Sequence, residues 1–207
     1  MMTKTVHLAV YDALADWEVG YAIAHIRGSF GQHAPGRYDV RTVGPSLAPV
    51  TTVGGMRILP DLALADLDPA GSAMLILPGA YSWETGDNAA FGVTARAFLD
   101  AGVPVAAICG ATGGLAREGL LDDRDHTSSA LEYLSPTGYA GAAHYRDVPA
   151  ITDGNLITAG PTAPVEFARE VFAKLDIYTP ETLKAWYRLF GEQDASAFFE
   201  LAAVVPQ

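Results

Sequence analysis

Two kinds of hydrophobic pattern alternate along this chain. Short, continuous apolar runs are typical of strands covered on both faces of a parallel sheet, whereas apolar residues that recur every three or four positions indicate helices. The continuous runs predict strands at residues 6–12, 37–44, 73–79, 104–109 and 155–160. The periodic segments predict helices at residues 16–26, 88–102, 110–119, 130–134, 162–175 and 179–190, with a last amphipathic segment at 195–205. Two β-rich runs around Gly54 and Gly55 predict a hairpin within residues 50–61.

The alternation of strands and helices indicates the fold class. It predicts a three-layer α/β/α sandwich with a mostly parallel sheet, because helices that join parallel strands pack on the faces of the sheet. Asp16 is the expected N-cap of the first helix, and Thr179 followed by Pro180 marks the start of a late one. We expect residues 1–207 to form a single domain, with the helices at 179–204 packed on it or at an oligomer interface.

Composition narrows the class of partner. Half of the residues are hydrophobic and 18% are charged, which supplies a sizeable core and argues against disorder. The net charge of -11 makes nucleic acid and anionic membrane surfaces poor partners. A single cysteine makes no internal disulfide, the first residues are too polar for a signal peptide, and no apolar run is long enough to span a membrane. We therefore expect a cytoplasmic protein.

The single cysteine, Cys109, is the first candidate for chemistry. A lone cysteine in an apolar segment is commonly a small buried hydrophobic residue. Cys109, however, follows an apolar strand and precedes a helix, and small residues surround it: Gly110, Ala111, Gly113 and Gly114. This pattern is typical of a nucleophile elbow. The start of a helix favours thiolate, so the pattern predicts a thiol pKa below about 8.5, and the Gly110 N–H could bind an oxyanion.

The carboxyl ends of other predicted strands offer partners for the cysteine, because ligands bind at this edge of a parallel sheet. Gly79 and Ala80 could supply a second oxyanion donor, or form an ordinary turn after a strand. Glu18 could act with the thiol, or simply stabilise a helix start. Trp83 and Tyr81 could wall a pocket or belong to the core.

A histidine partner for Cys109 is not evident. The nearest imidazole downstream is His126, which could complete a Cys–His pair or be a polar loop residue. The chain has no CxxC or HExxH motif, and the segment GATGGLA lacks the glycine spacing of a dinucleotide site. We therefore expect neither a metal nor a cofactor.

Four segments, in order, resemble the ThiJ/PfpI superfamily, a flavodoxin-like branch related to class I glutamine amidotransferases. They are VYDALADWE, ILPGAYSW, AICGATGGLAREGLLDDRDHTS and ITAGPTAPVEFA, and the resemblance covers about residues 5 to 174. It implies that Cys109 is the nucleophile, that Glu18 is the carboxyl group beside it, and that Gly79, Ala80 and Gly110 form the oxyanion pocket. Protease-like members carry histidine directly after the cysteine, and others carry one about twenty residues later. This chain has Gly110 and Ser129 at those places.

These features together favour a cysteine-dependent hydrolase or lyase that acts on a small carbonyl or amide compound. The missing histidine favours condensation with a reactive carbonyl over peptide cleavage, which must protonate an amine leaving group. The alternative is a thiol redox sensor or stress-related binding protein in which Cys109 is oxidised to sulfenic acid or a stable sulfinate. A third possibility keeps the fold without activity. The resemblance also implies a homodimer.

Overall fold

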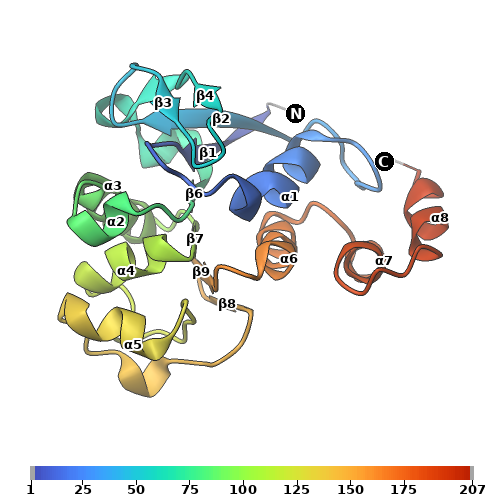
Figure 1. Ribbon diagram of the computed structural model, residues 1–207. Coiled ribbons are helices and arrows are strands. Elements are labelled where there is room, and N and C mark those ends of the chain that lie inside the picture. Colours follow the sequence, from blue (N-terminus) through green and yellow to red (C-terminus); the bar gives the residue numbers. More distant parts are fainter. Residues whose placement is uncertain (1–2, 206–207) are drawn as a thin grey trace.

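The computed structural model describes residues 3–205, which fold around a central sheet of seven strands (Figure 1). The strand order is β5-β2-β1-β6-β7-β9-β8. Neighbouring strands are parallel, except that β8 runs antiparallel to β9. The strands are β1 (Lys4–Ala9), β2 (Tyr38–Gly44), β5 (Leu62–Ala63), β6 (Ser72–Leu77), β7 (Val105–Ile108), β8 (Ala150–Asp153) and β9 (Leu156–Ala159).

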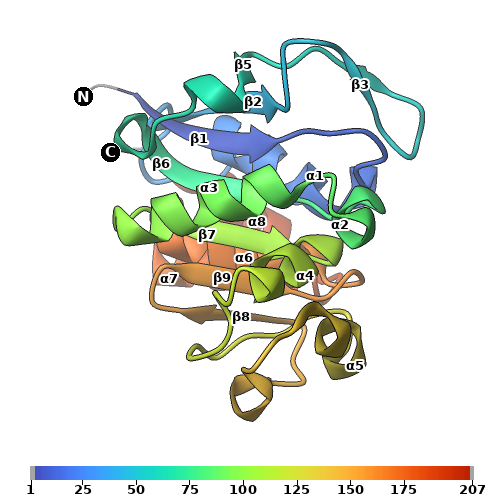
Figure 2. The ribbon, with the colours of Figure 1, turned by 90° about the vertical axis from the view of Figure 1, so that its left-hand side faces the viewer.

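Helices cover both faces of the sheet, so the predicted flavodoxin-like sandwich is confirmed (Figures 1 and 2). One face carries α1 (Asp16–Arg27) and α6 (Pro164–Leu175), with α7 (Pro180–Phe190) and α8 (Ala197–Ala202) beyond them. The other face carries α2 (Ser82–Thr85), α3 (Ala89–Asp100), α4 (Gly110–Arg117) and α5 (Leu131–Leu134). Short 3-10 helices lie at Leu64–Asp66, Pro69–Gly71, Ser135–Thr137 and Ala142–His144. None of the helices within residues 3–205 is both long and apolar enough to cross a membrane.

The continuous apolar runs form the middle of the sheet. Residues 74–77 of β6 and all of β7 have no exposed surface, because helices pack on both of their faces. The edge strands were not predicted. β5 has only two residues, and β8 is half-buried along its length, so neither carries a continuous apolar run. The one-turn helix α2 was missed for a similar reason, since a single turn shows no periodicity.

The predicted hairpin is present and covers the start of α1. It pairs β3 (Val50–Thr51) with β4 (Arg57–Ile58), and the turn uses Gly55 at a φ of 83°. Asp16 was expected to cap α1, but the cap position is Ala15. The Asp16 carboxylate instead accepts a hydrogen bond of 2.6 Å from the Gly54 N–H, so it fixes the hairpin to the helix.

The C-terminal helices pack on the sandwich through aromatic side chains. Thr179 caps α7 as predicted, since its hydroxyl accepts a hydrogen bond from the Thr182 N–H. Trp186 of α7 has no exposed surface and lies edge-on to Phe172 of α6, with ring centroids 4.9 Å apart. It also contacts His25 of α1. These contacts hold α7 against α6 and α1, whereas an oligomer interface at these helices stays a prediction.

The sheet brings three chain turns to one edge. β1 lies between β2 and β6, and the helices that follow β1 and β6 lie on opposite faces of the sheet (Figure 1). A crevice forms where successive connections diverge in this way, outside the carboxyl ends of the strands. Glu18 follows β1, Gly79 follows β6, and Cys109 follows β7. The topology therefore places the three predicted segments around the same crevice.

Candidate active site

Cys109 lies in a strained turn between β7 and α4. Its backbone has a φ of 57° and a ψ of -127°, a conformation that side-chain-bearing residues adopt rarely and at a cost of about 1–3 kcal/mol. The Cys109 N–H donates to the Ala159 carbonyl at 3.0 Å, and the Cys109 carbonyl accepts from the Thr112 N–H and hydroxyl at 3.0 and 2.6 Å. These bonds hold the turn in place. The predicted nucleophile elbow is thus confirmed as a backbone geometry.

Glu18 faces the cysteine from the first turn of α1. Its side chain is completely buried, and its Oε2 accepts a hydrogen bond of 2.6 Å from the Gly79 N–H. Its Oε1 has no hydrogen-bond partner among the described residues. The Glu18 carboxyl and the Cys109 thiol lie close enough that each changes the pKa of the other. A buried carboxyl without full pairing beside a thiol is a group able to hold or move a proton.

The electrostatics of this pair differ from the expectation for the thiol. Burial raises the pKa of Glu18 to about 7, against the opposing effect of the Gly79 hydrogen bond. Burial, followed by the neighbouring Glu18 carboxylate, raises the pKa of Cys109 to about 12. The Gly110 N–H and the Ser129 hydroxyl lower it by less. The expectation of a thiol pKa below 8.5 is therefore wrong while Glu18 is ionised, because burial outweighs the helix start.

Gly79 has a different part in the site from the one expected. Its N–H is bonded to Glu18, so it is not free to bind an oxyanion. A Cβ at Gly79 would lie 2.8 Å from the Cys109 Cβ and 2.9 Å from both Glu18 carboxyl oxygens. Only glycine therefore lets the carboxyl and the thiol approach each other. The remaining expected donors are the N–H groups of Ala80 and Gly110, and a Cβ built on Gly110 would lie 3.4 Å from the Ala80 nitrogen.

Cys109 opens onto a pocket of about 290 Å³. Five of the predicted site residues line it: Cys109, Glu18, Gly79, Ala80 and Gly110. Tyr81 and Ser129, which the sequence had also drawn attention to, line it too. The rest of the wall is formed by Ala13, Ala15, Trp17, Val53, Glu84 and Tyr133. These last residues were missed because they come from four separate segments, although a tryptophan directly before Glu18 was a usable signal.

Trp83 does not line the pocket, so that expectation is wrong. Its side chain is only 1% exposed, and its Nε1–H donates to the Tyr11 hydroxyl at 2.9 Å and to the Pro78 carbonyl at 3.0 Å. Its ring lies against Gly114 of α4. Trp83 is therefore a core residue that holds the turn after β6 against the helix after Cys109. Tyr81, on the exposed side of the same turn, is the aromatic residue at the pocket.

Gly114→Ala is expected to destabilise the protein by about 1–3 kcal/mol, the usual cost of overpacking. The added Cβ would lie 2.2 Å from two Trp83 ring atoms, although alanine is otherwise the better helix former. Gly20→Ala in α1 is the matched control. Nothing lies within 4 Å of its added Cβ, so we expect a gain of about 0.5–1 kcal/mol. Urea unfolding measures both, and an unchanged Gly114→Ala midpoint would contradict the packing of Trp83.

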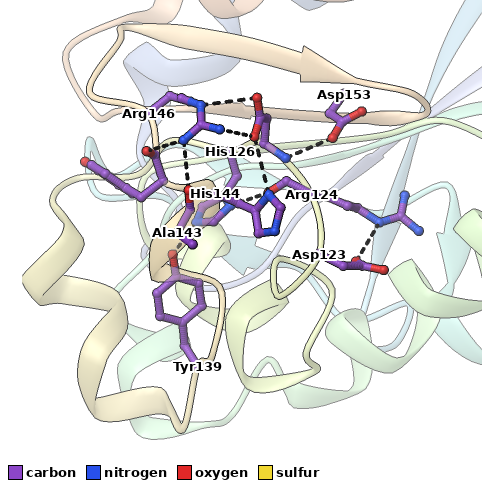
Figure 3. A network of polar contacts seen from close by, with 10 residues as sticks. Asp123, Arg124, His126, Tyr139, Ala143, His144, Arg146 and Asp153 are labelled. Carbon is purple, nitrogen blue, oxygen red and sulfur yellow. Dashed lines mark hydrogen bonds and ion pairs between the residues drawn. The ribbon is translucent and has the colours of Figure 1, made fainter.

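His126 is completely buried, and both of its ring nitrogens are occupied (Figure 3). Nδ1 lies 2.7 Å from the Arg124 carbonyl, and Nε2 lies 2.5 Å from the Tyr139 hydroxyl. A carbonyl only accepts, so Nδ1 carries the hydrogen and Nε2 accepts from tyrosine. His126 is not among the residues that line the pocket. His126 therefore does not face Cys109 across the pocket, and of the two expectations the polar loop residue fits its position.

The surroundings of His126 form a structural clamp (Figure 3). The Arg146 N–H donates to the His126 carbonyl at 2.8 Å, and its guanidinium is paired with Asp125 at 2.7 Å. The His126 N–H donates to the His144 carbonyl at 3.2 Å. The clamp joins residues 124–126 to residues 139–146, just before the segment that carries Ser129 and Tyr133. Within residues 3–205, no three His, Cys, Asp or Glu side chains gather as metal ligands would.

Known proteins are similar to this chain in fold and in sequence. The model of the DJ-1/PfpI family matches residues 4–174. The uncharacterized protease YoaZ of Bacillus subtilis (strain 168) is 40% identical over 204 residues, or 97% of each chain. The thiJ/pfpI family protein from Bacillus anthracis has a TM-score of 0.92 at 38% identity, covering 100% of this chain and 99% of that one. The DJ-1 superfamily protein Atu0886 from Agrobacterium tumefaciens has a TM-score of 0.82 at 34% identity, covering 92% and 100%. With its elbow cysteine at the crevice of a flavodoxin-like sheet, the chain belongs to the DJ-1/PfpI family.

Proposed function

We propose that this protein is a cysteine-dependent enzyme that adds its Cys109 thiol to a small, reactive carbonyl compound. The observation that carries the proposal is the arrangement at the base of the pocket. A cysteine in a strained elbow faces a buried carboxyl group whose pKa burial raises to about 7. Ala80 and Gly110, whose N–H groups are the expected oxyanion donors, line the same pocket. A nucleophile, a proton carrier and oxyanion donors are the parts that carbonyl addition requires.

The first step follows from the positions of these groups. The Glu18 carboxylate accepts the thiol proton while the sulfur attacks the carbonyl carbon. The carbonyl π electrons move to oxygen, where the Ala80 and Gly110 N–H groups stabilise the negative charge. Glu18 then returns the proton to that oxygen, and the product is a neutral thiohemiacetal. This proton exchange also removes the second cause of the raised thiol pKa, since the carboxylate that opposes thiolate formation is neutralised as the thiolate forms, whereas the effect of burial stays.

Peptide cleavage is less well supported. An amine leaving group needs an acid positioned to protonate it, and the family's usual candidate is a histidine. No histidine of residues 3–205 lines the pocket, and Ser129 is found where other members carry the later histidine. The word protease in the name of the Bacillus subtilis relative therefore does not set the expectation for this chain.

A thiol redox sensor is the second candidate, because of one feature of Glu18. A carboxyl with a pKa near 7 is partly protonated at neutral pH, and its hydrogen could bond a sulfinate oxygen on Cys109. The sensor differs from the enzyme in one measurable way, since it would be oxidised by peroxide without turning over any carbonyl compound.

The proposal is tested by assaying the wild type and Cys109→Ser on methylglyoxal, glutamine and casein. We expect the wild type to consume methylglyoxal, to leave casein intact, and to lose activity in the serine variant. Thermal unfolding of the variant controls for folding. Wild-type proteolysis, or carbonyl turnover that survives Cys109→Ser, would contradict the proposal. Peroxide oxidation of Cys109 without any turnover would favour the sensor.

A further inference from the structure

Two carboxyl groups, and no cationic side chain of residues 3–205, line the pocket that holds Cys109. Glu18 and Glu84 are the charged residues of the lining, and no lysine, arginine or histidine is among them. The Arg117 guanidinium belongs to the neighbouring groove, where it donates to the backbone carbonyls of Trp83 and Glu84 at 2.5 and 3.3 Å. Arg117 is thus outside the pocket lining, and its charge reaches the pocket only at Tyr133, where it opposes the effect of Glu84. The chain as a whole has a net charge of -11, so the surrounding field has the same sign.

Three aromatic side chains also line the pocket. Trp17 is 54% exposed and Tyr81 is 73% exposed, and both line the pocket together with the half-buried Tyr133. The face of an aromatic ring attracts a cation, and a carboxylate beside such rings strengthens that attraction. A wall of this composition suits ammonium groups.

Glu84 and the thiol act on the same tyrosine, which places them in one electrostatic environment. Burial, followed by the charges of Glu84 and Cys109, raises the pKa of Tyr133 to about 12, against the opposing effect of the Arg117 charge. The Tyr133 hydroxyl lies 3.4 Å from the Gly110 carbonyl, at the first turn after Cys109. A substrate bound at the thiol is thus within the field of the Glu84 carboxylate. A molecule with its own carboxylate would be repelled there, whereas one with an ammonium group would be attracted.

We propose that the pocket selects compounds that carry a positive charge beside the reactive carbonyl, and that Glu84 is the residue that sets this preference. The inference rests on the proposed function only in naming the substrate class of the same site. The charge selection itself concerns access to Cys109, and it is measurable without any turnover.

The experiment compares two methanethiosulfonate reagents of similar size, one bearing trimethylammonium and one bearing sulfonate. Each transfers its thiol half to a cysteine and releases methanesulfinate. The ratio of their second-order rate constants at pH 8 and low salt is measured for Cys109 by mass spectrometry. The reference is the exposed thiol of a Cys109→Ser/Ser46→Cys double variant. Both reagents attack the same thiolate, so the ratio of their rate constants does not depend on the thiol pKa and can be compared between the two cysteines. We expect the cation-to-anion ratio at Cys109 to exceed the reference by about tenfold or more, with the excess falling as salt rises.

The variants test the assignment to Glu84. Glu84→Gln should reduce the excess by about threefold or more, whereas Glu192→Gln, an exposed carboxylate on the loop after α7, should leave it unchanged. A wild-type ratio equal to the reference, or an excess that Glu84→Gln does not change, overturns the proposal. Turnover of trimethylammonium acetaldehyde and glyoxylate provides the second arm, where kcat/KM should favour the cation. Charge selection without turnover would support this inference and overturn the proposed function. Turnover without charge selection would support the proposed function and overturn this inference.

Discussion

Glu18→Gln is expected to make the protein more stable, by about 3–4 kcal/mol above pH 7. The wild type keeps a carboxyl completely buried, and burial raises its pKa from 4.5 to about 7. Each pH unit of such a difference corresponds to about 1.4 kcal/mol of lost stability once the group is ionised. Glutamine removes the charge and still offers an oxygen to the Gly79 N–H.

The pH dependence of this gain identifies its cause. Between pH 4.5 and about 7 the unfolded state has lost the Glu18 proton while the native state still holds it, so wild-type stability falls as pH rises through this window. The advantage of the variant should therefore be absent below about pH 4.5 and complete above pH 7. Urea unfolding at pH 4.5, 6 and 8 measures it, with Glu192→Gln as the control that shows no such trend. A variant less stable than the wild type at pH 8 would contradict the burial of an ionisable carboxyl here.

The same variant should make Cys109 easier to ionise. Removal of the neighbouring carboxylate is expected to lower the pH of half-maximal iodoacetamide alkylation by about 1–3 pH units, the usual effect of a nearby charge. An unchanged midpoint would show that the carboxyl and the thiol titrate independently, and the proton exchange in the proposed mechanism would then fail.

His126→Ala is expected to have the opposite effect on stability, a loss of about 3–5 kcal/mol. The substitution removes a large, fully buried side chain and leaves the Arg124 carbonyl and the Tyr139 hydroxyl without their partner. Because His126 does not line the pocket, the alkylation midpoint of Cys109 should stay as in the wild type at temperatures where the variant is folded. A stable variant with a shifted Cys109 alkylation midpoint would instead indicate that His126 acts on Cys109 in the active site.

Acid should reveal the same histidine in the wild type. Burial lowers the pKa of His126 below 6.5, so the unfolded state binds its proton first and stability falls as pH drops below about 6.5. His7 and His25, whose pKa values burial also lowers, act in the same direction. Glu18 acts in the opposite direction in this range and partly masks the loss. In the Glu18→Gln background the decline with acid should therefore be steeper.

The sequence predicted the parts of the site that follow from backbone topology. Glu18, Gly79 and Cys109 each come directly after a buried strand or within the first turn that follows one, and the carboxyl-end rule places such residues together. The same rule says nothing about side-chain direction. Trp83 therefore could not be distinguished from Tyr81 in advance, because one turn of helix has no periodic pattern to show which side faces the core.

Other misses came from competing physical effects. The helix start suggested a lowered thiol pKa, but desolvation and a like charge at Cys109 are larger effects, and their sizes depend on burial that a sequence does not reveal. Gly79 was expected to donate a hydrogen bond to a substrate. Its role in the structure is instead to leave room for Cys109 and Glu18, which fill the space where a side chain would lie. The pocket wall at Trp17, Glu84 and Tyr133 comes from three helices, so no local motif joined these residues.

The positive φ of Cys109 has a consequence for laboratory evolution. Strain at the elbow and the buried Glu18 carboxyl both weaken the folded state, and neither is needed to build the sheet. Glycine adopts such a backbone freely, and glutamine removes the buried charge. A library selected only for heat resistance should therefore accumulate substitutions at 18 and 109 and discard the chemistry while keeping the fold. Counter-selection with a thiol-reactive probe would be required to keep Cys109 in such a campaign.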